Sequence, residues 1–311
     1  MPYEMSRLLL VVVFWLAFVE MSWAQRKQVC VTVDDLPVVN YGNDDPEFLK
    51  EVTEKLITTF DVHSIPAIGY VNERKLYKGG RLDQSKVALL GYWLEAGYEL
   101  GNHTYSHHNY HKTAFNTFTE DILKGEKITR PLTEKYGMPY RFFRHPYLKI
   151  GKTQSSADSL SSFLSGQGYT EAPVTIDPDD YLFAKAYHIA LQKGNSLKAS
   201  KVATAYLKHI EKKIQFYEEV STKLFNRNIS HTLLIHANLL NADYLSEVAQ
   251  IFKKKGYTFI SQEEVLKDTV YGTPVTRYGD WGMSWMDRWA MTQGKNTLLR
   301  DDPLVPESIL K

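Results

Sequence analysis

The sequence predicts a parallel α/β fold, and three observations lead to that class. Short β-branched or aromatic runs alternate with amphipathic helical segments along most of the chain, which is the pattern of a parallel sheet with crossover helices. Seven such units fit a distorted (β/α) barrel of about seven parallel strands better than a short open sheet, although an open doubly wound sheet is the alternative. Polar residues suited to catalysis follow five of the expected strands.

Strands are expected where four to six β-branched, aromatic or small apolar residues run together. In chain order these runs are 29–33, 66–71, 98–102, 140–144, 173–176, 232–235 and 257–260. The first run, Val-Cys-Val-Thr-Val, stops at two aspartates.

Helices are expected between the strands because apolar residues recur there at helical spacing, as Leu49, Val52 and Leu56 do. The segments are 46–60, 83–96, 117–136, 155–167, 181–225, 243–255 and 262–266. The region 181–225 is one helix or two, broken near Gly194. A glycine, which ends a helix readily in the left-handed conformation, follows four of the segments: Gly97, Gly137, Gly168 and Gly256. The tail from Tyr271, rich in Trp and Gly, is expected to be irregular coil packed on the barrel.

The composition excludes some classes of function. The 311-residue chain has a formal net charge of +1 and no long basic block, so nucleic acid is not an expected partner. Aromatic residues make up 13% of the chain, which suits sugar-stacking surfaces, although aromatic side chains also fill cores. A single cysteine cannot form an internal disulfide, and Cys30 is expected to be a buried small apolar residue.

The N-terminus has the pattern of a secretory signal peptide. Arg7 precedes an apolar run at 8–19, and a small-x-small cleavage pattern ends at Ala24. The run is too short to span a bilayer comfortably. We therefore expect a signal peptide at 1–24, one catalytic domain at 25–311 with no stable membrane insertion, and export to the periplasm or the extracellular space. An uncleaved N-terminal anchor is the alternative.

Four of the ten histidines fall within residues 101–111. His103 and His107 are four positions apart, and on a helical turn such positions share a face, so that two imidazoles there can bind one metal ion. A solvated histidine-rich loop is the alternative. His108 and His111 are expected to be solvated loop residues rather than ligands.

The candidate catalytic residues share one placement, because each lies at the end of an expected strand. In chain order they are Asp34, Asp35, His103, Arg144, the segment 177–180 and His236. In parallel α/β folds the C-terminal ends of the strands form the active face. The sequence therefore predicts that five separate segments converge on one site.

These residue types support metal-assisted hydrolysis. Adjacent carboxylates in an extended chain point in different directions, so one of Asp34 and Asp35 can bind a metal while the other faces the water on that metal. One carboxylate with His103 and His107 makes a three-ligand Zn²⁺ site with an open fourth position, the pattern of catalytic zinc. Such a metal lowers the pKa of water to about 7 and polarises a carbonyl. A strand-ending turn is the alternative reason for the two aspartates.

Five ordered segments resemble the motifs of the polysaccharide deacetylases, which form carbohydrate esterase family four and share the NodB-homology domain. The segments are Thr32-Val33-Asp34-Asp35, His103-Thr104-Tyr105-Ser106-His107, Arg141-Phe142-Phe143-Arg144-His145-Pro146-Tyr147, Asp177-Pro178-Asp179-Asp180-Tyr181 and Leu233-Leu234-Ile235-His236. The resemblance covers residues 28–260, and its most specific parts are the His-Ser/Thr-x-x-His motif and the Arg-x-Pro-Tyr piece. It implies a distorted barrel of the NodB-homology type and a hydrolase that acts on an acetylated glycan.

The resemblance also implies which residues hold the metal and which act as base. Asp35, His103 and His107 would hold a divalent metal, most often Zn²⁺. Asp34 would be the general base that takes a proton from the metal-bound water. Arg144 would pair with Asp34 and favour its ionised form.

The general acid and an oxyanion donor follow from the same resemblance. His236 would protonate the leaving amine or alcohol, and Asp180 would orient His236 and balance its charge. The backbone N–H of Tyr147 would stabilise the tetrahedral oxyanion. The unusual fourth motif leaves open whether Asp177 or Asp180 pairs with His236. This chain also has Tyr181 where the family usually has Trp.

Together these expectations describe an exported, metal-dependent hydrolase that removes N- or O-linked acetyl groups from a polysaccharide or oligosaccharide. One alternative is a small cyclic amide or imide hydrolase of the same fold type. Another is a non-catalytic carbohydrate-binding or metal-binding module. The module requires the metal or acid residues to be missing, and none of them is.

Overall fold

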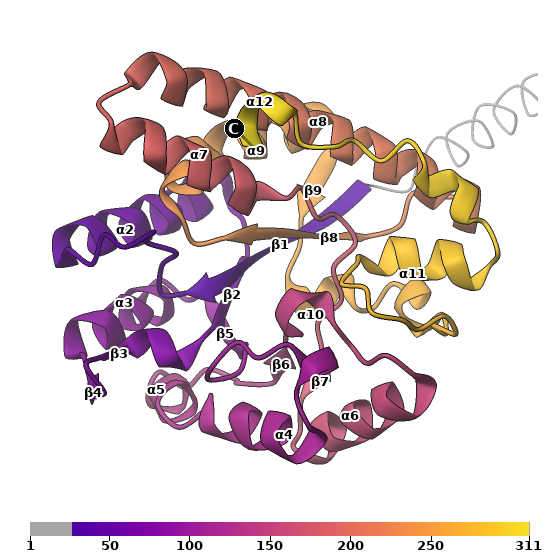
Figure 1. Cartoon of the computed structure of the whole chain (residues 1–311), viewed down its shortest axis with the longest axis horizontal. Helices are drawn as coiled ribbons and strands as arrows, with labels where there is room; N and C mark the ends of the chain where they lie inside the picture. Colours follow the sequence, from indigo (N-terminus) through magenta and orange to yellow (C-terminus); the bar gives the residue numbers. More distant parts are fainter. Residues whose placement is uncertain (1–26, 311) are drawn as a thin grey trace, which may run out of the picture.

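The computed structural model describes residues 27–310, in which a parallel sheet is surrounded by helices (Figure 1). The signal peptide predicted at 1–24 lies outside these residues. Within 27–310, no helix is long and apolar enough to cross a membrane.

Among the described residues, seven parallel strands form the main sheet, and the first of them pairs with three others. The strands are β1 (Lys27–Leu36), β2 (Ile68–Val71), β5 (Glu99–Asn102), β6 (Phe142–Phe143), β7 (Thr170–Glu171), β8 (His231–His236) and β9 (Tyr257–Phe259). The order is β7-β6-β5-β2-β1-β8, and β9 pairs with the N-terminal end of β1. A two-stranded antiparallel hairpin, β3 (Tyr77–Lys78) with β4 (Arg81–Leu82), is separate from this sheet and was not expected from the sequence.

Helices follow the strands as crossover connections. The α-helices are α2 (Pro46–His63), α3 (Gln84–Glu95), α4 (Phe115–Lys124), α5 (Thr129–Lys135), α6 (Gln154–Gly166), α7 (Asp180–Gln192), α8 (Ser196–Phe225), α9 (Leu239–Lys254), α10 (Gln262–Val265), α11 (Trp285–Thr292) and α12 (Glu307–Leu310). Short 3₁₀ turns are η2 (Glu73–Leu76), η3 (Tyr110–Lys112), η4 (Pro146–Leu148), η5 (Thr269–Gly272) and η6 (Asn296–Leu299). Helix α2 begins as its sequence suggests, because the Asp45 side chain accepts from the Glu47 N–H and proline occupies the first helical turn.

The segment between β6 and α7 joins the two edges of the sheet and completes the distorted barrel. The N–H groups of Thr170 and Ala172 donate to carbonyls on the β6 side, and Ile176 forms a parallel bridge with β8. The strand predicted at 173–176 is therefore reduced to a bridge at Ile176, and the paired strand β7 lies earlier in the chain. Pro173 has no N–H to give to a ladder, which accounts for the interruption.

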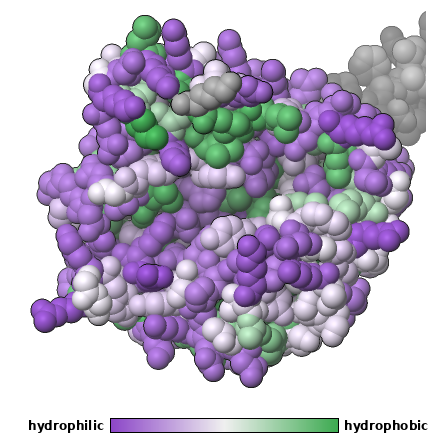
Figure 2. Space-filling model, viewed as in Figure 1, coloured by the Kyte–Doolittle hydropathy of each residue, from purple (hydrophilic) through white to green (hydrophobic). Residues whose placement is uncertain are grey.

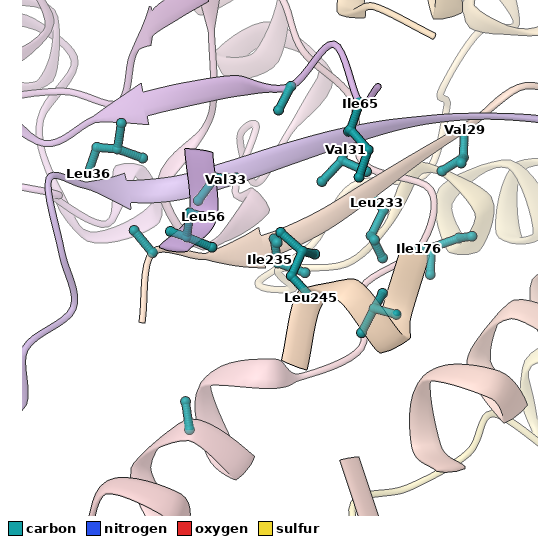
Figure 3. Close-up of a cluster of buried hydrophobic side chains, with 14 of the residues drawn as sticks. Val29, Val31, Val33, Leu36, Leu56, Ile65, Ile176, Leu233, Ile235 and Leu245 are labelled. Carbon is teal, nitrogen blue, oxygen red and sulfur yellow. The ribbon is translucent and has the colours of Figure 1, made fainter. Parts of the chain in front are cut away.

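The core lies between the sheet and the helices that cover it (Figure 3). Val31 and Val33 of β1 are buried and belong to one apolar cluster with Leu56 of α2 and Leu245 of α9. Each fully buried side chain of this kind stabilises the fold by roughly 1.5–3 kcal/mol. Cys30 is buried, as expected, and makes no disulfide.

Two predicted elements differ from the structure for physical reasons. The single helix expected at 117–136 is two helices, α4 and α5, with Gly125 at the break. A Cβ on Gly125 would lie 2.4 Å from the backbone of Thr104, so the chain approaches the histidine loop at a point where only glycine fits. The tail after Tyr271 is not all coil, because α11 is helical and places Trp289 in the core.

The face shown in Figure 2 is mostly hydrophilic, with hydrophobic residues gathered where α7, α8 and α12 meet. These helices cover the β8 side of the barrel (Figure 1). The face that carries the candidate site is formed by the strand ends and the loops that follow them.

Candidate active site

The candidate residues converge at the C-terminal ends of the strands, as the sequence predicted. Their positions are Asp34 and Asp35 in β1, His103 after β5, Arg144 after β6, Asp180 at the start of α7 and His236 at the end of β8. A cavity of about 620 Å³ opens over these strand ends. Asp34, Asp35, His103, His107 and His236 line it, while Arg144 and Asp180 are fully buried behind it.

Asp35, His103 and His107 place three potential metal-ligand atoms close together. Oδ1 of Asp35 lies 3.8 Å from Nε2 of His103 and 3.7 Å from Nε2 of His107, and the ligand atoms all lie within 4.8 Å of one another. The Asp35 oxygen is buried and has no hydrogen-bond partner. One carboxylate and two imidazoles around a common point fit a divalent metal with an open coordination position.

The protein fixes the tautomer of His103. Its Nδ1 lies 2.8 Å from the carbonyl oxygen of Arg144, and because a carbonyl only accepts, Nδ1 carries the proton. Nε2 therefore presents a lone pair to the cavity, which is the usual arrangement of a metal-binding histidine. Burial holds the pKa of His103 well below its usual value, which favours the neutral, ligating form.

His103 and His107 approach each other in a loop rather than on the helical turn that their spacing suggested. Thr104 and His107 have positive φ angles of 65° and 55°. The hydroxyl of Thr104 accepts from the His107 N–H at 3.0 Å, and the Asn102 side-chain oxygen accepts from the Thr104 N–H at 2.7 Å. These local bonds replace helical ones and set the two imidazole centroids 4.8 Å apart.

Both aspartates reach the cavity because β1 is irregular at its end. Asp35 has φ 67°, and the pairing of β1 with β2 shifts register between Val33 and Leu36. A regular strand would send the two side chains to opposite faces. Oδ2 of Asp34 instead lies 3.8 Å from Nε2 of His103, beside the metal ligands.

Arg144 is fully buried and lies behind Asp34, on the side of the protein interior. Its Nη1 is 3.8 Å from Asp34 Oδ2, and its Nη2 donates to the hydroxyl of Thr32 at 2.9 Å. Burial raises the pKa of Asp34 to about 6, and the Arg144 charge acts in the opposite direction. A carboxylate with this pKa is suited to accept a proton near neutral pH.

His236 and Asp180 form a hydrogen-bonded pair, in which His236 lines the cavity and Asp180 is buried behind it. Nδ1 of His236 is 2.7 Å from Oδ1 of Asp180, and the His236 N–H donates to Oδ2 at 2.9 Å. The amides of Asn238 and Asn241 also donate to Oδ2. Burial lowers the pKa of His236, but Asp180 outweighs it and raises the pKa to about 9. At neutral pH this imidazole is therefore a proton donor.

Asp177, the other candidate partner of His236, is placed differently. Its Oδ1 accepts from the backbone N–H of Asp179 at 3.1 Å, so it closes a turn before α7. Burial raises the pKa of Asp177 to about 7. The geometry thus brings Asp180, and not Asp177, into contact with His236.

Tyrosine side chains and an apolar patch form the cavity walls. Tyr147 is 54% exposed, and its ring centroid lies 4.5 Å from that of His107. Tyr181 stacks edge-on at 6.0 Å from His236, and its carbonyl accepts from the Tyr41 hydroxyl. Leu148 and Leu234 line the cavity and pack with Val174.

Two residues of the site were missed by the sequence reasoning. Lys75 donates to the carbonyl of Asp35 at 2.8 Å, although no motif singled it out as part of the site. His145 lines the cavity and bonds Glu171 through Nε2 at 2.7 Å. Its position directly after Arg144 was the available signal.

His108 and His111, the other two histidines of the loop, lie in different environments. His108 is exposed, as expected. His111 is not a solvated loop residue, because its Nε2 accepts from the Gly151 N–H and its Nδ1 lies 3.2 Å from Asp280. Both partners belong to segments far from the histidine loop, so His111 ties that loop to the tail. Within residues 27–310, neither histidine joins the group of possible metal ligands.

Comparison with protein families finds one match. Residues 23–161 match the family model described as polysaccharide deacetylase, a span that includes Asp34, Asp35, His103, His107 and Arg144. A search of curated proteins finds no match.

Solved structures share the fold over most of the chain. A polysaccharide deacetylase from Bacillus cereus is 16% identical, with a TM-score of 0.53 and coverage of 76% of this chain and 92% of that one. A chitin deacetylase from the fungal pathogen Colletotrichum lindemuthianum is 18% identical, with a TM-score of 0.52 and coverage of 82% and 92%. A family-four carbohydrate esterase pseudoenzyme from Bacillus anthracis is 16% identical, with a TM-score of 0.53 and coverage of 78% and 66%.

At these identities the structural likeness establishes the fold, while the family model adds the sequence evidence. The structural likeness confirms the distorted parallel barrel that the sequence predicted. Over residues 23–161 the chain matches the polysaccharide deacetylase family, and it has the distorted parallel barrel of the solved deacetylase structures.

Proposed function

We propose that this protein is an exported, metal-dependent deacetylase of a glycan, active on N- or O-linked acetyl groups. One observation carries the proposal: a buried base beside a three-ligand metal site and a charged imidazole face the same cavity. Asp34 stands by His103 and Arg144, and His236 stands by Asp180. Hydrolysis of an amide or ester needs a proton acceptor for water and a proton donor for the leaving group.

Asp35, His103 and His107 would hold the metal, and their nitrogen and oxygen ligands suit Zn²⁺. A divalent ion supplies Lewis acidity there, which lowers the pKa of water to about 7 and polarises the acetyl carbonyl. The unpartnered Oδ1 of Asp35 and the lone pair of His103 Nε2 support this assignment.

In the proposed reaction, Asp34 takes the proton of the attacking water as the new C–O bond forms at the acetyl carbon. The Tyr147 N–H stabilises the negative oxygen that results. His236 then gives its proton to the nitrogen or oxygen of the sugar as the bond to the acetyl carbon breaks, and acetate leaves. Asp180 keeps His236 oriented and protonated until that step.

The cavity walls suit an acetylated sugar. Leu148 and Leu234 offer a small apolar surface to an acetyl methyl group. Tyr147 and Tyr181 are exposed at the rim, where aromatic rings can stack against a sugar. The signal peptide predicted at 1–24 supports export and so an extracellular or periplasmic polymer.

Acetate release tests the proposal. The mature protein is incubated with N-acetylated and O-acetylated oligosaccharides, and acetate is measured for the wild type and for Asp34→Ala, His103→Ala and His236→Ala. We expect release by the wild type and at least a 100-fold loss in each variant, the typical contribution of an acid or base. Equal turnover in all four proteins would exclude the assigned roles.

The fold alone does not decide activity, because one structural neighbour is a pseudoenzyme. This chain keeps the residues of the metal site and of the acid pair, which supports an enzyme. Metal analysis of the purified protein separates the two cases. A catalytic protein is expected to hold about one divalent ion per chain, whereas a trace would favour a non-catalytic module.

A further inference from the structure

Lys75 contacts the candidate metal ligand Asp35 from the side opposite the histidines. Its Nζ donates to the Asp35 carbonyl at 2.8 Å and lies 3.4 Å from Oδ2 of the carboxylate. The other oxygen, Oδ1, faces Nε2 of His103 and of His107. One oxygen of the Asp35 carboxylate therefore faces the Lys75 ammonium group, and the other faces the position where a metal would bind.

The backbone that carries Lys75 is also bonded to the histidine loop. The N–H groups of Glu73 and Arg74 donate to the carbonyls of Thr104 and Tyr105. The Asn72 amide, in its favoured orientation, donates to the Tyr105 carbonyl and accepts from the His107 N–H, each at 3.1 Å. The backbone of η2 is therefore anchored to the histidine loop, and the Lys75 ammonium group is held beside the site by its hydrogen bond to the Asp35 carbonyl.

A fixed positive charge at this place has two consequences. It attracts the Asp35 carboxylate, which draws electron density away from Oδ1, and it repels any cation held between Oδ1 and the imidazoles. In the absence of a metal, the same charge balances a carboxylate that is packed beside a second one, Asp34. Both effects favour the metal-free protein over the metal-bound one.

We propose that Lys75 is an electrostatic competitor of the metal, which stabilises the metal-free site and keeps metal affinity below the value that its three ligands would otherwise give. The inference rests on the proposed function only for the existence of the metal site. A metal held under such competition also withdraws more charge from its remaining ligands, which favours a reactive water. Lys75 is a positioning residue, since it acts through Asp35.

The test is a measurement of metal affinity without substrate. Lys75→Gln keeps a hydrogen-bond donor near the Asp35 carbonyl and removes the charge, and Lys75→Arg keeps the charge. Lys78→Gln is the matched control, because Lys78 pairs with Asp44 at the surface and is 65% exposed. Zn²⁺ and Co²⁺ affinities are obtained by competition with a chromophoric chelator.

We expect Lys75→Gln to bind Zn²⁺ about tenfold more tightly than the wild type, the effect of a change of about 1.4 kcal/mol. Lys75→Arg and Lys78→Gln are expected to stay within about twofold of wild type. Thermal unfolding of the metal-free proteins is the second readout, and Lys75→Gln is expected to unfold at a lower temperature than Lys78→Gln. Unchanged or weaker metal binding by Lys75→Gln would overturn the proposal. Because acetate release is not measured, a failure of the deacetylase assignment leaves this result interpretable.

Discussion

The imidazole Nδ1 of His236 lies 2.7 Å from the carboxylate of Asp180, although 56 positions separate the two residues. His236 ends β8 and Asp180 begins α7, so the fold brings a strand end against a helix start. The carboxylate accepts from four donor groups, from His236, Asn238 and Asn241. This pair sets the protonation state of the proposed general acid.

Replacing Asp180 is expected to shift the pH dependence of activity. The Asp180 charge raises the pKa of His236 to about 9 against the effect of burial, so His236 is charged below that pH and loses its proton above it. Activity that needs the proton should therefore decline above about pH 9. In Asp180→Asn burial is opposed only by the weaker effects of Asp35 and Asp34, and the alkaline limb of kcat/KM should move well below pH 9, towards the ordinary value of histidine near 6.5.

Asp177→Asn is the control for that measurement. Asp177 accepts from the Asp179 N–H rather than from His236. The alkaline limb of the Asp177→Asn profile should therefore stay near that of the wild type. An Asp180→Asn profile that matches the wild type would show that Asp180 does not govern the acid.

The metal site is expected to depend on each of its three residues. His107→Ala removes one of three ligands, and the Zn²⁺ affinity should fall by more than about 100-fold, since even the loss of an outer hydrogen-bond partner costs 10- to 100-fold. His108→Ala, at the exposed neighbouring position, should bind as the wild type does. Equal affinity of the two variants would remove His107 from the site.

Gly282 is expected to hold Tyr147 in place. A Cβ at Gly282 would lie 2.0 Å from the carbonyl oxygen of Tyr147, a distance that the backbone can only relieve by moving. Gly282→Ala should therefore displace Tyr147, whose φ is already 57°, and reduce kcat by about 10-fold or more while global stability changes little. Gly272→Ala is the matched control, because nothing lies within 4 Å of its added Cβ. Full activity of Gly282→Ala would show that the position of Tyr147 is unimportant.

Much of the site could be predicted because polar residues at strand ends carry a readable signal. A carboxylate or imidazole directly after a buried β-branched run has few structural reasons to be there, and the ends of parallel strands meet on one face. Asp34, His103 and His236 were found in that way. The fold class followed from the same alternation of strands and helices.

Other parts could not be read because their signal is not local. Lys75 reaches Asp35 only through the fold, and nothing in its neighbourhood distinguishes it from a surface lysine. The choice between Asp177 and Asp180 depended on where α7 begins. The helix α11 did carry a local signal, since Ser284 and Asp287 form a capping box before Trp289, but the aromatic and glycine content of the tail obscured it.

The core is expected to tolerate little change beside β1. Leu56 is fully buried against β1, and Leu56→Ala should lower the free energy of unfolding by about 2–5 kcal/mol because it leaves a cavity. Leu304→Ala, at a site 84% exposed, should change it by less than about 0.5 kcal/mol. Denaturant unfolding of both variants measures the difference, and similar midpoints would contradict the packing around β1.

The central claim is that metal held by Asp35, His103 and His107 is required for deacetylation. The most direct measurement is acetate release from an acetylated oligosaccharide by protein that has been stripped with a chelator and then supplied with Zn²⁺. The account predicts that stripping abolishes release, that Zn²⁺ restores it in the wild type, and that Zn²⁺ does not restore it in His103→Ala. Release that persists at the wild-type rate in the stripped protein would contradict the account.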